Sequence, residues 1–395
     1  MHGVIPPLRR ATQAGISLVE TLVALVLGLA MVSVAFNLYV SNRSVFRQIE
    51  GMVRLQESAS VAAALLETDI RHAAGTLCRN NPPTTSLLAT PNLFWETGES
   101  LNLISFLGLH GYESITTDPI AGGLRLAGDS ISIMSDNMGK VARVTASATY
   151  ASSNFGFTGS YTFPVDSGLD FPVGTVAAAC DYNRAVLFQV TGSGPSTITL
   201  QANMGSSVSP GNCAVTMRRI RAANTDPIAP LDGQWSCTNG QNSNSTSGQM
   251  YTFGPGSMVG EHTFHHWYVG KNSSTNACCS LRRLSATYSA TGVGSTDEEI
   301  VENVTDMQIT YLPGLLYTGY PAKGYYVPEY DNRTYDGISN YANYTYRMVT
   351  AVRIVLTLTS PDKVGLGANN AASAATYTVP INVAIRARMP SVVRR

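Results

Sequence analysis

The chain has 395 residues, 26 basic and 26 acidic side chains, and a charged fraction of only 13%. A dedicated nucleic-acid-binding protein is strongly basic, so this charge balance argues against that class. The length allows an anchor plus one large or two ordinary domains. The 35 glycines and 19 tyrosines, with so few charges, are typical of an exported β-rich protein with long polar loops.

An apolar stretch lies near the N-terminus, from Ile16 to Val40. It is 25 residues long, and Glu20 is its only ionised side chain. As a helix it covers about 37 Å, enough to cross a bilayer core of about 30 Å. A carboxylate inside a membrane is costly, so we expect Glu20 to have a partner of opposite charge. Arg9 and Arg10 precede the stretch, so the positive-inside rule puts residues 1–15 in the cytoplasm and the chain after Val40 outside.

Two ordinary explanations compete for this stretch. One is a plain membrane anchor with a stray acid. The other is a conventional signal peptide, but the apolar run is too long for that and lacks a small-residue cleavage site after it.

The helix is expected to continue beyond the membrane to Leu77, since no proline interrupts it. Apolar and small residues recur there at alternating four- and three-residue spacing, which predicts an amphipathic helix. They are Val45, Ile49, Met52, Gln56, Ala59, Ala63, Leu66, Ile70 and Ala73. Gly75 and the Asn80–Pro83 cluster are expected to end the helix.

Short β-branched or aromatic segments separated by Gly, Pro, Ser and Asn follow, and they predict strands. They are Leu103–Leu107, Ser130–Met134, Val141–Thr145, Ala185–Thr191, Thr197–Leu200, His262–Val269, Leu281–Ser289, Met307–Leu312, Met348–Thr359 and Tyr377–Arg388. Ile300–Asp306 is expected to form one helical turn. The fold class is therefore α+β: a long N-terminal helix, half transmembrane and half amphipathic, followed by a large globular head of mainly antiparallel sheet.

Six cysteines face an oxidising compartment if the head is exported, so disulfides are expected. The candidates are Cys78, Cys180, Cys213, Cys237, Cys278 and Cys279, and their 15 full pairings stay open. A zinc site is the competing interpretation, but only Cys278 and Cys279 are close together and no CxxC motif exists.

Other candidate sites are weaker. Glu261, His262, His265 and His266 could bind a metal, but they are not an HExxH motif, and on a strand residues 262 and 266 lie about 13 Å apart. Asp297–Glu299 with Asp306 could hold calcium, although no twelve-residue calcium loop is present. Basic residues at 218–221 and 282–283 are too sparse for a nucleic-acid groove. No catalytic motif, cofactor or metal is expected.

The N-terminal residues resemble the class III signal of type IV prepilins and type II secretion pseudopilins. The resemblance rests on a basic leader, Gly15, and a glutamate at residue 20 inside an apolar run. It implies cleavage by a prepilin peptidase between Gly15 and Ile16 and N-methylation of Ile16, although this family usually has Phe there. It also implies that Glu20 pairs with the terminal amine of a neighbouring subunit in a filament.

Further blocks resemble the PilW-type minor pilins and, in part, the minor pseudopilin J of type II secretion. They are Arg54–Glu57, Leu66, Asp69–Arg71, Ala74-Gly75 and Cys78; Cys180-Asp181, Ala185 and Leu187–Thr191; Val301–Val304, Met307-Gln308 and Tyr311; Ala351–Arg353; and Ile385–Arg388. This pilin-like plan divides the chain into a leader (1–15), a transmembrane polymerisation helix (16–40), an amphipathic helix that packs on the head (41–77) and a periplasmic β-rich head (78–395).

The resemblance implies a minor pilin that helps prime assembly of the type IV pilus and forms part of its tip. Its expected location is the inner membrane as a prepilin with the head in the periplasm, then the extracellular pilus tip. The expected partners are the prepilin peptidase, other minor pilins, the major pilin and a tip adhesin, with no nucleic acid. Two alternatives remain: a pseudopilin J-like subunit of type II secretion, and a pilin-anchored adhesin or DNA-uptake receptor.

A tyrosine-rich segment supplies the candidate partner surface. Residues 311–346 hold ten tyrosines, and tyrosine gives a large contact area at low entropic cost. The surface is assigned to Tyr317, Tyr320, Tyr325, Tyr326, Tyr330 and Tyr335. A self-packed surface loop is the competing interpretation.

Overall fold

The computed structural model describes residues 17–78, 84–88, 108–113, 118, 120–153, 158–202, 210–212, 215, 251–276, 278–290, 292–313, 349–366 and 372–388. Contacts divide the chain into two units: Met1–Arg54 with Asp362–Ala375, and Leu55–Pro361 with Thr376–Arg395. Each unit is described by itself.

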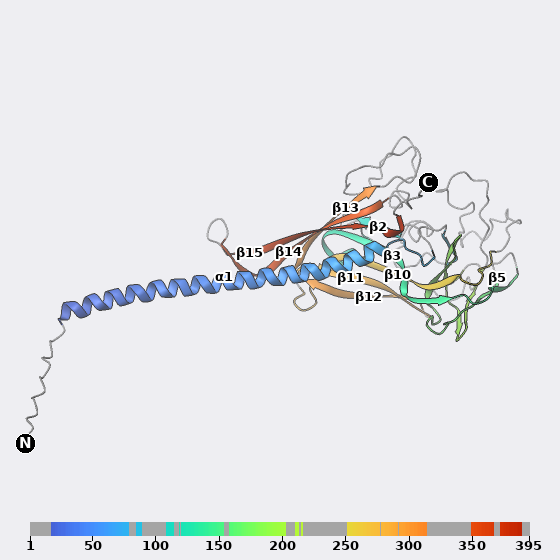
Figure 1. Cartoon of the computed structure of the whole chain (residues 1–395), viewed down its shortest axis with the longest axis horizontal. Coiled ribbons are helices and arrows are strands. Elements are labelled where there is room, and N and C mark those ends of the chain that lie inside the picture. Colours follow the sequence, from blue (N-terminus) through green and yellow to red (C-terminus); the bar gives the residue numbers. More distant parts are fainter. Residues whose placement is uncertain are drawn as a thin grey trace, which may run out of the picture. The chain divides into compact units, whose positions relative to one another are not determined.

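A single long helix, α1 (Leu18–His72, 55 residues), opens the described part of the chain (Figure 1). Glu20 in its first turn and Arg71 and His72 in its last turn complement the helix dipole. The Ser17 hydroxyl accepts the N–H of Val19 at 3.3 Å and so caps the first turn. The expectation of a long apolar N-terminal helix is confirmed.

The rest of the described chain is β-rich. The strands are β1 (Thr84–Ser86), β2 (Leu109–Tyr112), β3 (Arg125–Arg143), β4 (Thr149–Ser153), β5 (Thr158–Pro164), β6 (Val176–Cys180), β7 (Ala185–Gln189), β8 (Gly192–Gly194), β9 (Thr197–Gln201), β10 (Met258–Lys271), β11 (Cys278–Ser289), β12 (Gly292–Glu302), β13 (Val304–Pro313), β14 (Val349–Leu366) and β15 (Ala372–Ala384). Two short 3-10 helices, η2 (Gly122–Leu124) and η6 (Arg386–Arg388), complete the described elements.

These strands form three sheets. The largest has eight strands in the order β1-β7-β6-β10-β11-β12, with β3 also paired to β10 and β2 paired to β3. Only the β1–β7 pair in it is parallel. A second sheet has the order β4-β5-β9-β8, and a third has the order β13-β14-β15. The mainly antiparallel β domain predicted by the α+β class is confirmed.

The main core joins the C-terminal part of α1 to the strands. Its helical members are Leu55, Ala59, Ala62, Leu66, Ile70 and the following Ala73. They pack in one cluster with Ile131 of β3, Trp267 of β10, Leu281 of β11 and Met307 of β13. The spacing of four, three, four, four and three residues puts all six helical positions on one face.

Several local expectations differ from the structure. The helix expected to reach Leu77 ends at His72, and the strand expected at Tyr377–Arg388 ends at Ala384, before the short helix η6. The predicted strands Ser130–Met134 and Val141–Thr145 are parts of one strand, β3. The predicted helical turn at Ile300–Asp306 is wrong: Glu302 ends β12, Val304 begins β13, and Asn303 turns the chain with a φ of 66°. Asparagine adopts this left-handed conformation more readily than most residues, so a tight connection between strands is possible there.

Candidate functional site

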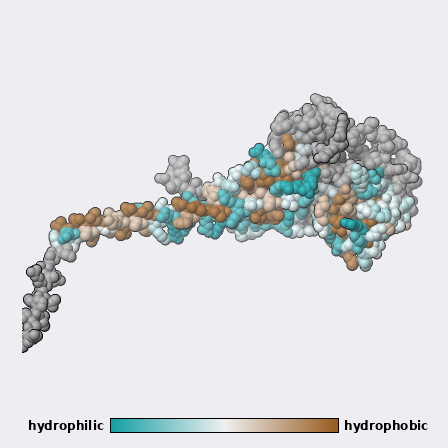
Figure 2. All heavy atoms as spheres, viewed as in Figure 1, coloured by the Kyte–Doolittle hydropathy of each residue, from teal (hydrophilic) through white to brown (hydrophobic). Residues whose placement is uncertain are grey.

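The N-terminal part of α1 is covered with exposed apolar side chains. Leu18 is 75% exposed and Met31 is 74% exposed, and the large apolar residues from Val19 to Val40 are also exposed. Figure 2 shows these apolar residues on the helix. Helix α1 is long and apolar enough to cross a membrane. Because each large side chain left in water forgoes about 1.5–3 kcal/mol, this surface is suited to lipid or to packed helices.

Glu20 lies in the first turn of α1 and is exposed. From Ser17 to Asn42 it is the only Asp, Glu, Lys or Arg, so it is a single negative charge in an apolar segment. Of the three N-terminal site residues predicted from the sequence, Gly15, Ile16 and Glu20, the structure describes Glu20 alone. Gly15 and Ile16 lie outside the described residues.

The C-terminal part of α1 is fixed to the β domain by a polar contact as well as by the core. The indole Nε1–H of Trp267 donates to Asp69 Oδ2 at 2.9 Å. The guanidinium of Arg283 lies 5.5 Å from the Trp267 ring centre and 4.0 Å from Asp69, and it also pairs with Glu298 at 3.0 Å. Helix, β10, β11 and β12 are therefore joined through one tryptophan and one arginine. Sequence reasoning did not assign this contact.

The chain after the helix is anchored to the large sheet. The N–H of Ala74 donates to the carbonyl of Met134 at 2.9 Å, and the N–H of Asp136 donates to the carbonyl of Gly75 at 3.2 Å. Next, Cys78 forms a disulfide with Cys180 at the end of β6, with their Cα atoms 5.8 Å apart. Two of the six candidate cysteines thus bind the helix exit to the sheet. Cys278 and Cys279 are adjacent at the start of β11, while Cys213 and Cys237 lie outside the described residues.

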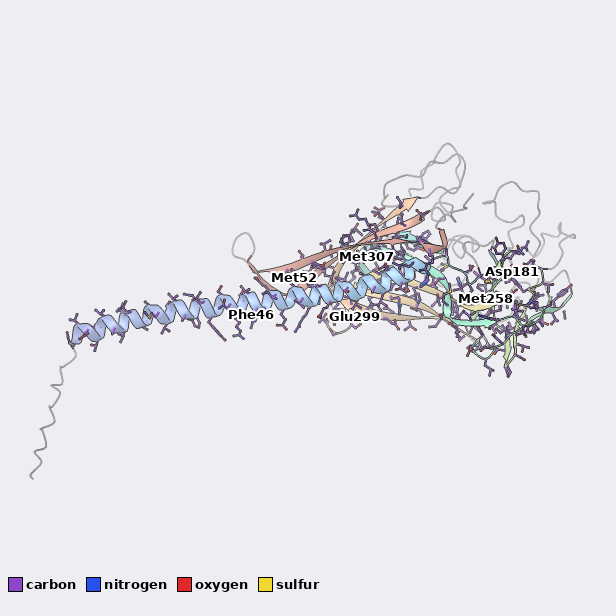
Figure 3. The ribbon with its side chains drawn as sticks, viewed as in Figure 1. Phe46, Met52, Asp181, Met258, Glu299 and Met307 are labelled. Atoms are coloured by element: carbon purple, nitrogen blue, oxygen red, sulfur yellow. A yellow bond between two sulfur atoms is a disulfide. The ribbon has the colours of Figure 1, made fainter. Side chains whose placement is uncertain are left out.

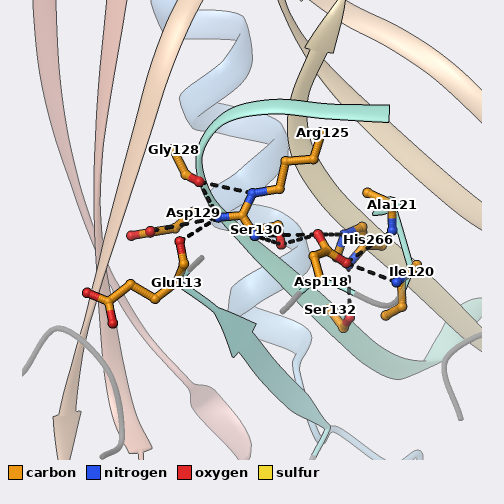
Figure 4. A network of polar contacts seen from close by, with 10 residues as sticks. All are labelled: Glu113, Asp118, Ile120, Ala121, Arg125, Gly128, Asp129, Ser130, Ser132 and His266. Atoms are coloured by element: carbon orange, nitrogen blue, oxygen red, sulfur yellow. Dashed lines mark hydrogen bonds and ion pairs between the residues drawn. The ribbon is translucent and has the colours of Figure 1, made fainter. Parts of the chain in front are cut away.

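A buried polar network lies between β3, β10 and β13 (Figure 4). The Arg125 guanidinium donates to the carbonyls of Gly128 and Glu113 and to Ser130 Oγ, the last two at 2.7 and 3.1 Å. It also lies 3.6 Å from Asp118 and 4.0 Å from Asp129. The buried cation is thereby both hydrogen-bonded and charge-compensated, which burial requires.

Gly128 is needed for this arrangement. Its φ is +63°, and a Cβ there would lie 2.5 Å from the carbonyl oxygen of Met307. The next residue, Asp129, accepts the N–H of Ile309 in β13 at 2.7 Å. Burial raises the pKa of Asp129 to about 6, against the opposing effects of the Ile309 hydrogen bond and of Arg125. This turn joins the large sheet to β13.

Asp118, His266 and Ser132 form a hydrogen-bonded chain inside the domain. His266 Nε2 lies 3.1 Å from Asp118 Oδ2, and its Nδ1 lies 3.0 Å from Ser132 Oγ. Burial alone would raise the pKa of Asp118, but hydrogen bonds from His266, Ser130 and Ala121 hold it well below its usual value. These are the residue types of a hydrolase triad, yet Ser132 and His266 are fully buried, so a substrate cannot reach the hydroxyl. The arrangement is suited to holding strands together.

The remaining histidine and acidic candidates have protein partners. His262 bonds to Asp136 at 3.0 Å and His265 to Ser285 at 2.9 Å. Glu261 pairs with Lys140 at 3.1 Å. Within the described ranges, no group of three or more His, Cys, Asp or Glu residues is arranged to hold a metal.

Ion pairs account for most of the acidic run in β12. Asp297 pairs with Arg282 and Glu298 with Arg283, both at 3.0 Å, and Glu299 accepts the N–H of Ser273 at 2.8 Å. Asp306 accepts from the side-chain amide of Gln308 instead. The run is therefore part of a charged ladder between β11 and β12. The six tyrosines assigned to a partner surface lie outside the described residues.

Sequence reasoning assigned no role to Trp267, Asp118 and Arg125, which are buried, or to Asp69, which is half-buried. An ionisable side chain beside large apolar residues, as Asp69 is beside Ile70, is the signal that could have indicated them.

Comparison of the chain with models of protein families, with curated proteins and with solved structures gives no match.

Proposed function

We propose that this chain is a PilW-type minor pilin of the type IV pilus, held first in the inner membrane and then built into the pilus tip, where it primes assembly. The observation that carries the proposal is Glu20, a lone carboxylate on the exposed apolar part of α1, five residues after Gly15. An anchor alone has no use for a charge at that depth.

The chemistry of assembly follows from the cost of that charge. Cleavage after Gly15 creates an amine at Ile16, and a neighbouring helix shifted along its axis can bring this amine to Glu20. Two opposite charges 4 Å apart attract by about 4 kcal/mol at an effective dielectric constant of about 20. Correctly registered subunits are thus favoured over separate helices in the membrane.

The attachment of α1 to the β domain supports the same proposal. A subunit that transmits assembly from its helix to its head needs the two held together. Asp69, Trp267 and the Cys78–Cys180 disulfide provide such a connection at the helix exit. The low charge and the Cys78–Cys180 disulfide also suit an exported head. Its activity is assembly and interaction with other pilins rather than catalysis, and the large head suits a tip position with no subunit above it.

Two alternatives predict different partners. A pseudopilin J-like subunit uses the same N-terminal chemistry but assembles with a secretion system. A pilin-anchored adhesin or DNA-uptake receptor binds its ligand through the head without priming filaments.

Substitution of Glu20 tests the proposal. In the native host, Glu20→Ala should leave peptidase processing and membrane level unchanged and lower the number of surface pili. Glu57→Ala is the matched control, because Glu57 is also an exposed helical glutamate but lies outside the apolar segment. Normal piliation with Glu20→Ala contradicts the proposed role of the charge. Normal piliation together with impaired type II secretion supports the pseudopilin alternative.

A further inference from the structure

Two arginines lie on α1 just beyond its exposed apolar segment. Arg43 and Arg47 are exposed, and no Asp or Glu lies between Glu20 and Glu50 in the sequence. Glu50 itself pairs with Arg54 at 2.7 Å. Among the side chains that the structure describes, no carboxylate pairs with Arg43 or Arg47. This part of the helix therefore carries two positive charges without a negative charge beside them.

Two aromatic residues share the same face of the helix. At about 100° per residue, Tyr39, Arg43, Phe46 and Arg47 all fall within about 100° of the helix surface. Tyr39 is 63% exposed and Phe46 is 72% exposed. Figure 3 labels Phe46, whose side chain projects from the helix. We refer to these four residues as the basic-aromatic face, and none of them belongs to a described hydrophobic core.

The basic-aromatic face lies at the depth of lipid headgroups when α1 crosses a bilayer. At a rise of about 1.5 Å per residue, Arg43 lies about 4.5 Å and Arg47 about 10.5 Å beyond Val40 along the helix. The headgroup layer on each side of a bilayer is about 5–8 Å thick. Helical side chains lean toward the N-terminus, which is the membrane side here, so both guanidinium groups can reach back into this layer.

These residue types suit the boundary between lipid and water. Tyrosine is enriched at this boundary because its ring is apolar and its hydroxyl is polar. A guanidinium binds a phosphate through two parallel hydrogen bonds, and it is more weakly hydrated than an ammonium group, so less hydration opposes the contact. The apolar stems of Arg43 and Arg47 and the ring of Phe46 can contact the edge of the acyl chains while the guanidinium groups stay among the phosphates.

We propose that the basic-aromatic face binds the phosphate of an anionic phospholipid, in the leaflet at the C-terminal end of the apolar segment. A zwitterionic lipid also has a phosphate, but its own ammonium group lies beside that phosphate and would come close to the two arginines. An anionic lipid has no such cation, so its charge complements the face. The inference rests on the membrane anchor of the proposed function, but not on cleavage after Gly15 or on pilus assembly.

Competition between two lipids tests the proposal. The full-length protein in a neutral detergent at low salt is mixed with equimolar phosphatidylglycerol and phosphatidylcholine of identical acyl chains, and the bound lipids are counted by native mass spectrometry. Each arginine near an anionic surface strengthens binding by about fivefold, so the preference for phosphatidylglycerol should fall by about 30-fold in the double variant Arg43→Gln/Arg47→Gln. Arg54→Gln is the matched control, because Arg54 is an exposed arginine on the same side of the helix but lies about 21 Å beyond Val40. It should change the preference by less than about twofold.

Glutamine forms helices about as well as arginine, so circular dichroism should show the same helix content in the wild type and all variants. A preference that is lost in the double variant and kept in Arg54→Gln supports the proposal. No preference in the wild type overturns it, as does a preference that the double variant keeps or that Arg54→Gln also loses. An unchanged lipid preference with weaker self-association of the double variant overturns it in favour of contacts with a neighbouring subunit. Release of the wild type from host membranes by alkaline carbonate overturns the lipid site together with the anchor, whereas the Glu20→Ala test concerns filament assembly alone, so the two proposals can fail separately.

Discussion

Replacing Arg125 by methionine tests the buried network most directly. Met keeps much of the length of the side chain but removes every donor and the charge. Asp118 then lacks its cation, and the carbonyls of Gly128 and Glu113 lose a donor. Breaking a buried ion pair costs about 3–5 kcal/mol, and an unsatisfied buried carbonyl about 1–3 kcal/mol, with overlap between the two. We expect the free energy of unfolding to fall by about 4 kcal/mol.

Urea unfolding of the full-length protein in detergent, followed by tryptophan fluorescence and circular dichroism, measures this loss. Arg143→Met is the matched control, because Arg143 ends the same strand and is exposed. It should change stability by less than about 0.5 kcal/mol. An Arg125→Met protein as stable as the control would refute the claim that the network holds β3 to its neighbours.

The other predictions concern the helix attachment and pH. Asp69→Ala leaves the Trp267 indole N–H unpaired, so it should lower the free energy of unfolding by about 1–3 kcal/mol and speed hydrogen exchange in residues 55–72. Glu67→Ala, the control, breaks only an exposed ion pair and should lower the free energy of unfolding by less than about 1 kcal/mol. Equal effects of the two substitutions would be evidence against the Asp69–Trp267 contact. The pKa of Asp129 is raised to about 6, so between pH 7 and 5 the folded state binds more protons than the unfolded state. Acidification from pH 7 to 5 should therefore raise the free energy of unfolding by about 1 kcal/mol. This gain should be absent in Asp129→Asn. Burial lowers the pKa of His110 to about 4, so on acidification the unfolded state takes up the proton before the folded state does. Acidification from pH 7 to 5 should therefore lower the free energy of unfolding by about 2 kcal/mol through this residue. This loss should be absent in His110→Gln. Urea titrations at pH 7 and pH 5 measure how the free energy of unfolding changes with pH. The same change in the wild type and in both variants would contradict the roles assigned to Asp129 and His110.

Local sequence patterns predicted the helices and strands whose formation depends mainly on residues close to one another in the chain. The apolar run and the absence of proline indicated α1, and β-branched runs indicated most of the long strands. Short strands such as β4 and β8 were missed, since their serine, threonine and glycine residues also suit loops. The helical turn expected at Ile300–Asp306 failed because the acidic residues just before it, Asp297 and Glu298, form cross-strand pairs with Arg282 and Arg283, a long-range effect that outweighs local propensity.

The site was predictable only where its signal is local. Glu20 stands out because it is a single charge in an apolar segment. In contrast, His266 and Asp118 are 148 residues apart, and Trp267 and Asp69 are 198 residues apart. No periodicity connects such pairs, since only the tertiary fold brings them together. The disulfide between Cys78 and Cys180, separated by 102 residues, was open for the same reason.

The central claim is that the N-terminus is processed as in a pilin, and intact-mass analysis with N-terminal sequencing of the protein from its own host's membranes tests it most directly. The account predicts a mature chain that begins with N-methylated Ile16, retains Glu20 and has lost residues 1–15. A chain that still begins at Met1, or that is cut elsewhere in a host with an active prepilin peptidase, would contradict it and reduce α1 to an ordinary membrane anchor.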